Sequence, residues 1–128
     1  MCRALTRILN GKDFKFDKEA IRAIAKEQVG QATQAGALER EAAQKAEQLS
    51  KSNLTTEQKE FFAQVTKVEQ KRIELFDTFR QSAEIWMDED EFNTIVSKRK
   101  PLMLRIQQLQ NEAAELELKL AEMQPGKR

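Results

Sequence analysis

The chain has 128 residues, with 22 basic and 21 acidic side chains and a net charge of +1. This length suits a single domain, and the balanced charge argues against a general nucleic-acid binder, which gains affinity by neutralising phosphates. Charged residues make up 34% of the chain, while only four glycines, two prolines and no tyrosine occur. Sandwiches and barrels need frequent turns and strand-forming residues, so we expect an all-α protein.

The chain contains no histidine and a single cysteine, Cys2. Zinc sites, Cys–His dyads and the Glu-x-x-His motifs of di-metal bundles are therefore excluded. The sequence also lacks a glycine-rich phosphate loop. We expect no enzymatic activity, no cofactor and no metal. The role of Cys2 stays open between a reactive or acylated thiol and an inert thiol near a terminus.

The sequence predicts no membrane span. Its longest uncharged run, residues 28–38, is rich in glutamine, glycine and alanine rather than in large apolar residues. The first sixteen residues hold too short an apolar run for a signal peptide. A lone cysteine forms no intramolecular disulfide, so nothing indicates an oxidising compartment. We expect a protein of the cytoplasm or of a larger particle.

Residues 1–16 are expected to form a short helix that ends at a turn, because Asn10-Gly11 is a strong turn signal. An alanine-rich helix over 17–50 should follow, with Asp17 as its N-cap. A 4-3 spacing along this helix picks out a stripe of small and partly polar residues: Ile21, Ala25, Gln28, Ala32, Ala35, Glu39, Ala42, Ala46 and Leu49.

Gly30 and Gly36 weaken this alanine-rich helix, each by about 1 kcal/mol relative to alanine in a helix interior. The helix should therefore either pack on another element or break near the glycines. Two arrangements remain open: the helix folds back to complete a three-helix bundle, or it extends to another chain.

A long antiparallel helical hairpin, similar to a coiled coil, is expected over 54–124. Its first helix, 56–87, should begin with a capping box made by Thr55 and Gln58. The apolar positions of this helix form a stripe wide enough to contact two neighbours. Nearly all the aromatic residues lie in this stripe, which predicts the centre of the core: Phe61, Phe62, Val65, Val68, Ile73, Leu75, Phe76, Phe79, Ala83, Trp86 and Met87.

The second helix of the hairpin is expected over 88–123. The acidic run 88–91 offers Asp88 as N-cap with Glu91 three residues later, a second capping box. The alternative use of this run, binding a cation or a basic partner, lacks the glycine-punctuated spacing of a calcium loop. We therefore interpret the run as a helix start.

A heptad pattern continues through this second helix from Phe92 to Met123. Pro101 interrupts it, which predicts a kink near Ser97 or two abutting helices, because proline cannot donate to the carbonyl four residues earlier. Folding about residue 88 places Phe62 near Leu116. The chain ends in a short basic tail, 125–128.

The first candidate surface is a helix-binding one. Small residues on the alanine-rich helix allow another helix to approach closely, and tryptophan is common in interface hot spots. For the tryptophan, closure of the core end is the alternative. The candidate partner-binding residues are Ala32, Ala35, Gly36, Ala42 and Trp86.

The second candidate surface is a basic cluster that could contact phosphates: Lys98, Arg99, Lys100 and Arg105. The alternative is a solvated face that pairs with acidic residues of the neighbouring helix, such as Asp77. No aromatic residue alternates with the cluster as a stacking platform for bases would require. We therefore favour the solvated face.

The sequence thus predicts a non-enzymatic helical protein that acts in protein–protein interaction or assembly. It would be a structural component or adaptor of a larger complex, such as a virion or secretion assembly. The partners expected are other helical proteins or further copies of the chain. The alternative is a nucleic-acid-associated regulator that uses the basic cluster around residues 98–105.

Overall fold

The computed structural model describes residues 17–123, and within this range the chain forms helices and no strand. The helices are α2 (Lys18–Ser50), α3 (Thr56–Asp88) and α4 (Phe92–Glu122). The expected all-α fold is confirmed. The short helix expected over 1–16, the basic tail and Cys2 lie outside the described residues.

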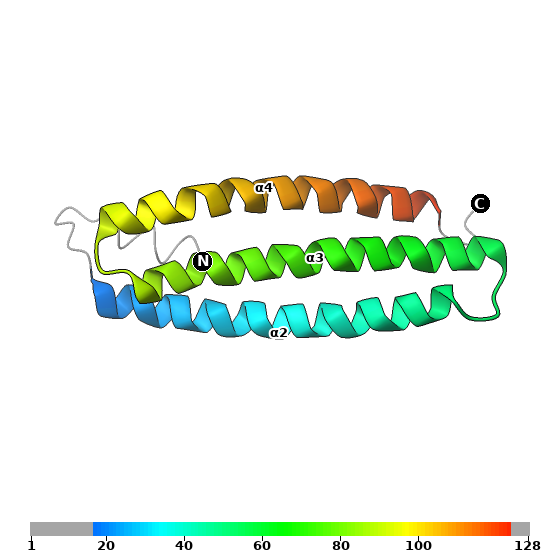
Figure 1. The fold of residues 1–128 in the computed structure, drawn as a ribbon, viewed down its shortest axis with the longest axis horizontal. Helices are drawn as coiled ribbons and strands as arrows, with labels where there is room; N and C mark the ends of the chain where they lie inside the picture. Colours follow the sequence, from blue (N-terminus) through cyan, green and yellow to red (C-terminus); the bar gives the residue numbers. More distant parts are fainter. Residues whose placement is uncertain (1–16, 124–128) are drawn as a thin grey trace.

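The three helices lie side by side, with α3 between α2 and α4 (Figure 1). Consecutive helices run antiparallel, and α3 packs along both of its neighbours, more extensively along α2. This packing is consistent with a three-helix bundle. The alanine-rich helix therefore folds back onto the rest of the chain.

Helix α2 begins where the sequence indicates. The Asp17 side chain accepts a hydrogen bond from the backbone N–H of Ala20 at 3.1 Å, as an N-cap does. The helix continues through both glycines without a break. Gly36 is buried, and a Cβ placed there would lie 3.9 Å from the Cβ of Phe76. Packing on α3 thus provides the stabilising contacts that the glycines of α2 led us to expect.

The buried face of α2 agrees with the expected stripe at Ile21, Ala25 and Ala46, and it lies one residue further on at Gly36 and Ala43. The structure exposes Ala42 and buries Ala43. A straight α-helix turns once in 3.6 residues, so a strict seven-residue pattern drifts round its surface. The buried residues are Ile21, Ala25, Gly36, Ala43 and Ala46.

Helix α3 begins with the expected capping box. The Thr55 hydroxyl accepts from the backbone N–H of Gln58, and the Gln58 side chain accepts from the backbone N–H of Thr55, both at 3.1 Å. The helix then runs to Asp88, within one residue of the expected end.

The start expected for the second hairpin helix is wrong. Helix α4 begins at Phe92, with Glu91 as an N-cap that makes no side-chain cap hydrogen bond, and Asp88 belongs to the end of α3. Packed helices stand 8–10 Å apart, so a helix that began at Asp88 would leave no residues to cross that distance. Glu89 and Glu91 have extended backbone angles and make the crossing.

Helix α4 passes through Pro101 as one helix, so the expectation of two abutting helices is wrong. Pro101 and Ser97 are both exposed, which leaves water free to hydrate the Ser97 carbonyl. The kink itself stays a prediction. Four positions of the expected heptad are the buried residues of this helix: Ile95, Ile106, Leu109 and Ala113.

The contacts between α3 and α4 place their register slightly away from the expected one. The Gln64 side chain donates to the Leu116 carbonyl at 3.2 Å, so Leu116 lies opposite a position two residues beyond Phe62. Near the other end, the Arg99 side chain donates to the Ser82 hydroxyl at 3.0 Å. Polar contacts that an apolar pattern does not reveal thus contribute to the register.

Leu109→Ala tests the core. Leu109 is fully buried, so we expect the free energy of unfolding to fall by about 2–5 kcal/mol in urea denaturation. The control is Leu118→Ala, at a residue 65% exposed on the same helix, which should change it by less than about 0.5 kcal/mol. If both changes lowered the free energy of unfolding equally, the result would contradict the orientation of α4, in which Leu109 is buried and Leu118 is exposed.

Candidate helix-binding groove

One side of the helical layer carries two hollows that share Phe76. The first, of about 270 Å³, lies between α2 and α3, and its walls are Gln28, Gln31, Ala32, Ala35, Phe76 and Phe79. The second, of about 400 Å³, is lined by all three helices, for example by Glu39, Leu75 and Ala114. We call the two hollows together the central groove. Because all three helices line the second hollow, the groove lies over α3, between α2 and α4.

Exposed apolar side chains continue the walls of the central groove. Leu38, 67% exposed, is seven residues beyond the groove residue Gln31. Met103, 46% exposed, is seven residues before the groove residue Gln110. Residues seven apart share a helix face, so both side chains flank the groove. Contiguous exposed apolar surface of this kind is typical of an interaction site.

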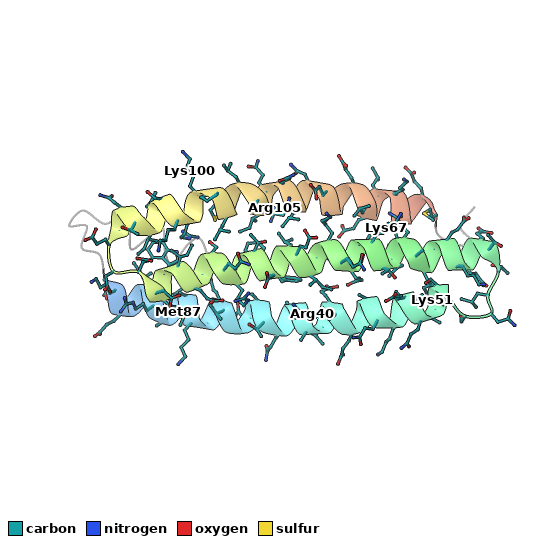
Figure 2. All side chains as sticks on the ribbon, in the orientation of Figure 1. Arg40, Lys51, Lys67, Met87, Lys100 and Arg105 are labelled. Atoms are coloured by element: carbon teal, nitrogen blue, oxygen red, sulfur yellow. The ribbon has the colours of Figure 1, made fainter. Side chains whose placement is uncertain are left out.

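Charged residues of α3, apart from Arg72, lie away from the groove walls. Lys71 pairs with Glu112 of α4 at 2.8 Å, and Arg80 pairs with Asp77 at 2.6 Å. These pairs hold charge on other faces of the layer. Figure 2 shows side chains along the whole length of the three helices, with Arg40 on α2, Lys51 just after its last residue, and Arg105 on α4. The groove is therefore mainly apolar, with one charged centre.

Arg72 forms that charged centre and links carboxylates from all three helices. Its guanidinium lies 2.6 Å from Glu117 of α4, 3.3 Å from Glu69 of its own helix and 3.9 Å from Glu39 of α2. Glu69 is only 8% exposed, and no described group donates to its buried Oε2 atom. Arg72 thus compensates a buried carboxylate and ties the two flanking helices to α3.

The structure separates the predicted partner-binding residues. Ala32 and Ala35 line the groove opposite Phe76 and Phe79, and Ala42 is exposed. Gly36 is buried against α3, so it supports intramolecular packing.

Trp86 also lies inside the protein, at 2% exposure, in a cluster that closes the end of the layer. Its neighbours come from all three helices: Ile21, Ala25, Ile95, Ile24, Ile85, Met87 and Phe92. The Arg99 guanidinium lies 5.0 Å from the centre of the Trp86 ring, a cation–π contact.

The predicted phosphate-binding residues are largely engaged within the chain. Lys98 pairs with Glu89, and Arg105 pairs with Glu74 at 3.1 Å. Arg99 covers Trp86. Lys100 is exposed, so the structure does not bring the four cations together as one free basic surface.

The sequence reasoning did not identify the groove residues of α3 and α4, such as Arg72, Phe79 and Gln110. The wide apolar stripe on α3 was a usable signal. A helix that packs on two neighbours leaves a groove over its own surface, between those neighbours. A second 4-3 pattern on α2, which includes Gln31, Ala35 and Leu38, was another.

The acidic run 88–91 joins α3 to α4, and its cap residue Glu91 makes no side-chain cap hydrogen bond. Asp90 accepts a hydrogen bond from Arg22 of α2 at 2.6 Å, and Lys18 lies 3.6 Å away. The Arg22 hydrogen bond, with the nearby Lys18 and Arg22 charges, lowers the pKa of Asp90 below 3.8. The start of α2 is thereby fastened to the α3–α4 connection.

Within residues 17–123, no group of acidic or cysteine side chains is arranged to hold a metal ion. No helix in the same range is long and apolar enough to cross a membrane. Comparison with protein families, with curated proteins and with solved structures finds no match for this chain. The central groove is therefore the feature of the molecule from which we infer a function.

Arg72→Gln tests the charged centre. The change leaves Glu69 buried without a counter-charge, so we expect a loss of about 1–3 kcal/mol in the free energy of unfolding. The control is Arg105→Gln, which breaks a solvent-exposed pair with Glu74 and should cost less than about 1 kcal/mol. Urea denaturation at neutral pH measures both, and equal losses would mean that Arg72 has no special role.

Asp90→Asn tests the fastening of α2. Because the folded-state pKa is lowered, the carboxylate stabilises the fold above its ordinary pKa of 3.8, and this contribution disappears as the pH falls through the lowered value. We expect the variant to melt at a lower temperature than the parent at pH 7, and at the same temperature once Asp90 is protonated. A difference that persisted at the lowest pH would contradict this assignment.

Proposed function

We propose that this chain is a non-enzymatic protein-interaction module that binds an amphipathic helix in the central groove, as a structural component or adaptor of an assembly. The observation that carries the proposal is the groove itself, with apolar walls from three helices. Exposed Leu38 and Met103 on its flanks support it.

A helix suits this groove better than a small molecule does. Small-molecule sites enclose most of their ligand and offer a few convergent polar groups. The two hollows instead follow one another along the helices through the shared residue Phe76, and their walls are mainly apolar. A fourth helix laid over α3 would contact both flanking helices, which is the arrangement of a four-helix bundle.

The polar groups in the groove suit an amphipathic occupant. Gln28 and Gln31 lie on the α2 wall, and Arg72 lies between Glu39 and Glu117. A helix that seats its apolar face on Phe79 and Leu75 can direct polar side chains towards these groups. The alternative, a nucleic-acid-associated regulator, gains no support, because Lys98, Arg99 and Arg105 already have partners in the chain.

Ala35→Arg tests the proposal. A display library of amphipathic helical peptides is selected on the purified chain, and the affinity of the selected peptides is measured by fluorescence anisotropy. An arginine at the groove wall should weaken binding at least about tenfold, because it obstructs the apolar face of the peptide.

The matched control is Ala37→Arg, at an exposed alanine of the same helix that lines no groove wall, and this variant should bind as the parent does. Gln31→Arg repeats the test at an exposed groove position, in case Ala35→Arg disturbs packing. If no peptide binds, or if both groove variants bind normally, the proposal is wrong.

A further inference from the structure

The first hollow of the central groove is short and lies towards the start of α2. It extends along that helix from Gln28 to Ala35, which is about 10 Å at 1.5 Å per residue. In the second hollow, the α2 wall is Glu39, further from the start of the helix. A chain segment that enters the groove beside the start of α2 therefore reaches the apolar first hollow before the charged second one.

The sequence before α2 contains a segment of suitable length and polarity, which lies outside the described residues. At about 3.6 residues per turn, residues 3–9 place Arg3, Thr6 and Arg7 on one face of a helix. The four apolar side chains share the opposite face, and they are Ala4, Leu5, Ile8 and Leu9. Seven helical residues span about 10 Å, which matches the length of the first hollow.

The connection to α2 is long enough to place this segment in the first hollow. Leu9 is eight residues before Asp17, the N-cap of α2, so these two residues can lie up to about 26 Å apart. The near end of the hollow, at Gln28, is about 16 Å beyond Asp17 along the helix. A helix packed on α2 lies about 8–10 Å to its side, so the required distance is about 19 Å. The segment then runs antiparallel to α2, with Arg3 at the far end of the hollow.

The charges of the segment and of the groove are complementary. Residues 1–16 contain four basic residues and one acidic residue, a net charge of +3. Beyond the far end of the first hollow, three carboxylates share the single guanidinium of Arg72, which leaves this cluster a net charge of −2. One of them, Glu39, is about 6 Å beyond the hollow along α2, within reach of an arginine side chain such as that of Arg3. Because these groups are partly exposed, their attraction orients the segment more than it strengthens the contact.

We propose that the chain's own residues 3–9 occupy the first hollow as a short helix antiparallel to α2, in competition with the partner helix. This inference rests on the proposed helix-binding function and names a regulation of the same groove. Leu5 and Ile8 pack on the aromatic floor of the hollow, and Arg3 reaches towards the acidic cluster. The segment fills the first hollow only, so a longer helix that covers both hollows gains more contact and displaces it.

The covalent connection makes a weak contact sufficient for this competition. A seven-residue helix is not stable alone in water, so the segment gains its order from the hollow. A short linker gives the segment an effective concentration of about 1 mM beside the groove. A contact with a dissociation constant of about 0.1 mM would then fill the hollow in about nine molecules of ten, and would weaken the apparent affinity of a partner about tenfold.

The first experiment measures the affinity of the selected helical peptides for the full chain by fluorescence anisotropy. Ile8→Glu removes an apolar contact and brings a carboxylate to the floor of the hollow, so the segment should leave and the peptides should bind about tenfold more tightly. The matched control is Thr6→Glu, which adds the same charge on the polar face of the segment and should bind as the parent does. An affinity that Ile8→Glu leaves unchanged overturns the inference.

The second experiment locates the segment by cross-linking within one molecule. In a Cys2→Ser background, Ala4→Cys is combined either with Ala35→Cys on the groove wall or with Ala37→Cys, an exposed position away from it. A short bismaleimide should join the first pair at least about tenfold faster than the second, because docking raises the local concentration of the thiol at the groove. Equal rates for the two pairs overturn the inference.

The outcomes separate this inference from the proposed function. If the peptides bind the parent and Ile8→Glu equally, and Ala35→Arg still weakens them, the groove binds helices without competition from the segment and the inference alone is wrong. If no peptide binds the parent or Ile8→Glu, the proposed function and the inference are both wrong. Tighter binding to Ile8→Glu, together with faster cross-linking at Ala35→Cys, supports both.

Discussion

The packing of the small-residue face of α2 on the aromatic residues of α3 is the contact on which the other features depend. Gly36 and its alanine neighbours have little surface of their own to bury, so α2 gains its stability by coming close to Phe76. Close approach also sets the depth of the central groove, since Phe76 lines both of its hollows. An alanine in place of Gly36 would make an ordinary contact with Phe76, whereas a longer side chain would push α2 away and change the shape of the surface that we propose as functional.

Helix α3 has two neighbours and therefore two roles. Its apolar residues support α2 on one side and α4 on the other, and the residues between these two contacts remain available to form the floor of the groove. Arg72 lies in this floor. It compensates the charge of the buried Glu69 and also contacts carboxylates on both flanking helices. The groove and the internal packing thus share the same helix, and a change to one affects the other.

Much of this fold could be predicted from the sequence, because the signals are local. Asp17 and Thr55 mark the two helix starts through side-chain hydrogen bonds made within three residues. The third start was missed because the acidic run resembles a capping box, whereas Asp90 uses its carboxylate on Arg22, 68 residues away in the sequence. The groove was missed for the same reason: Phe76, Glu39 and Gln110 come together only when three helices are in place. In the basic cluster, Lys98 pairs with Glu89 and Arg105 pairs with Glu74, whereas the sequence suggested Asp77 as a partner.

The order of packing along the chain has a consequence for how the protein folds. Helix α3 packs on the helix before it and on the helix after it, and short connections of a few residues join the three helices. Closing short loops costs little conformational entropy, and chains dominated by contacts between successive elements fold quickly. Helices α2 and α3 can pair while α4 is still being synthesised, because their contact needs nothing beyond residue 88. The second hollow of the groove is lined by all three helices, so the groove is complete only when α4 arrives, as the last step of folding.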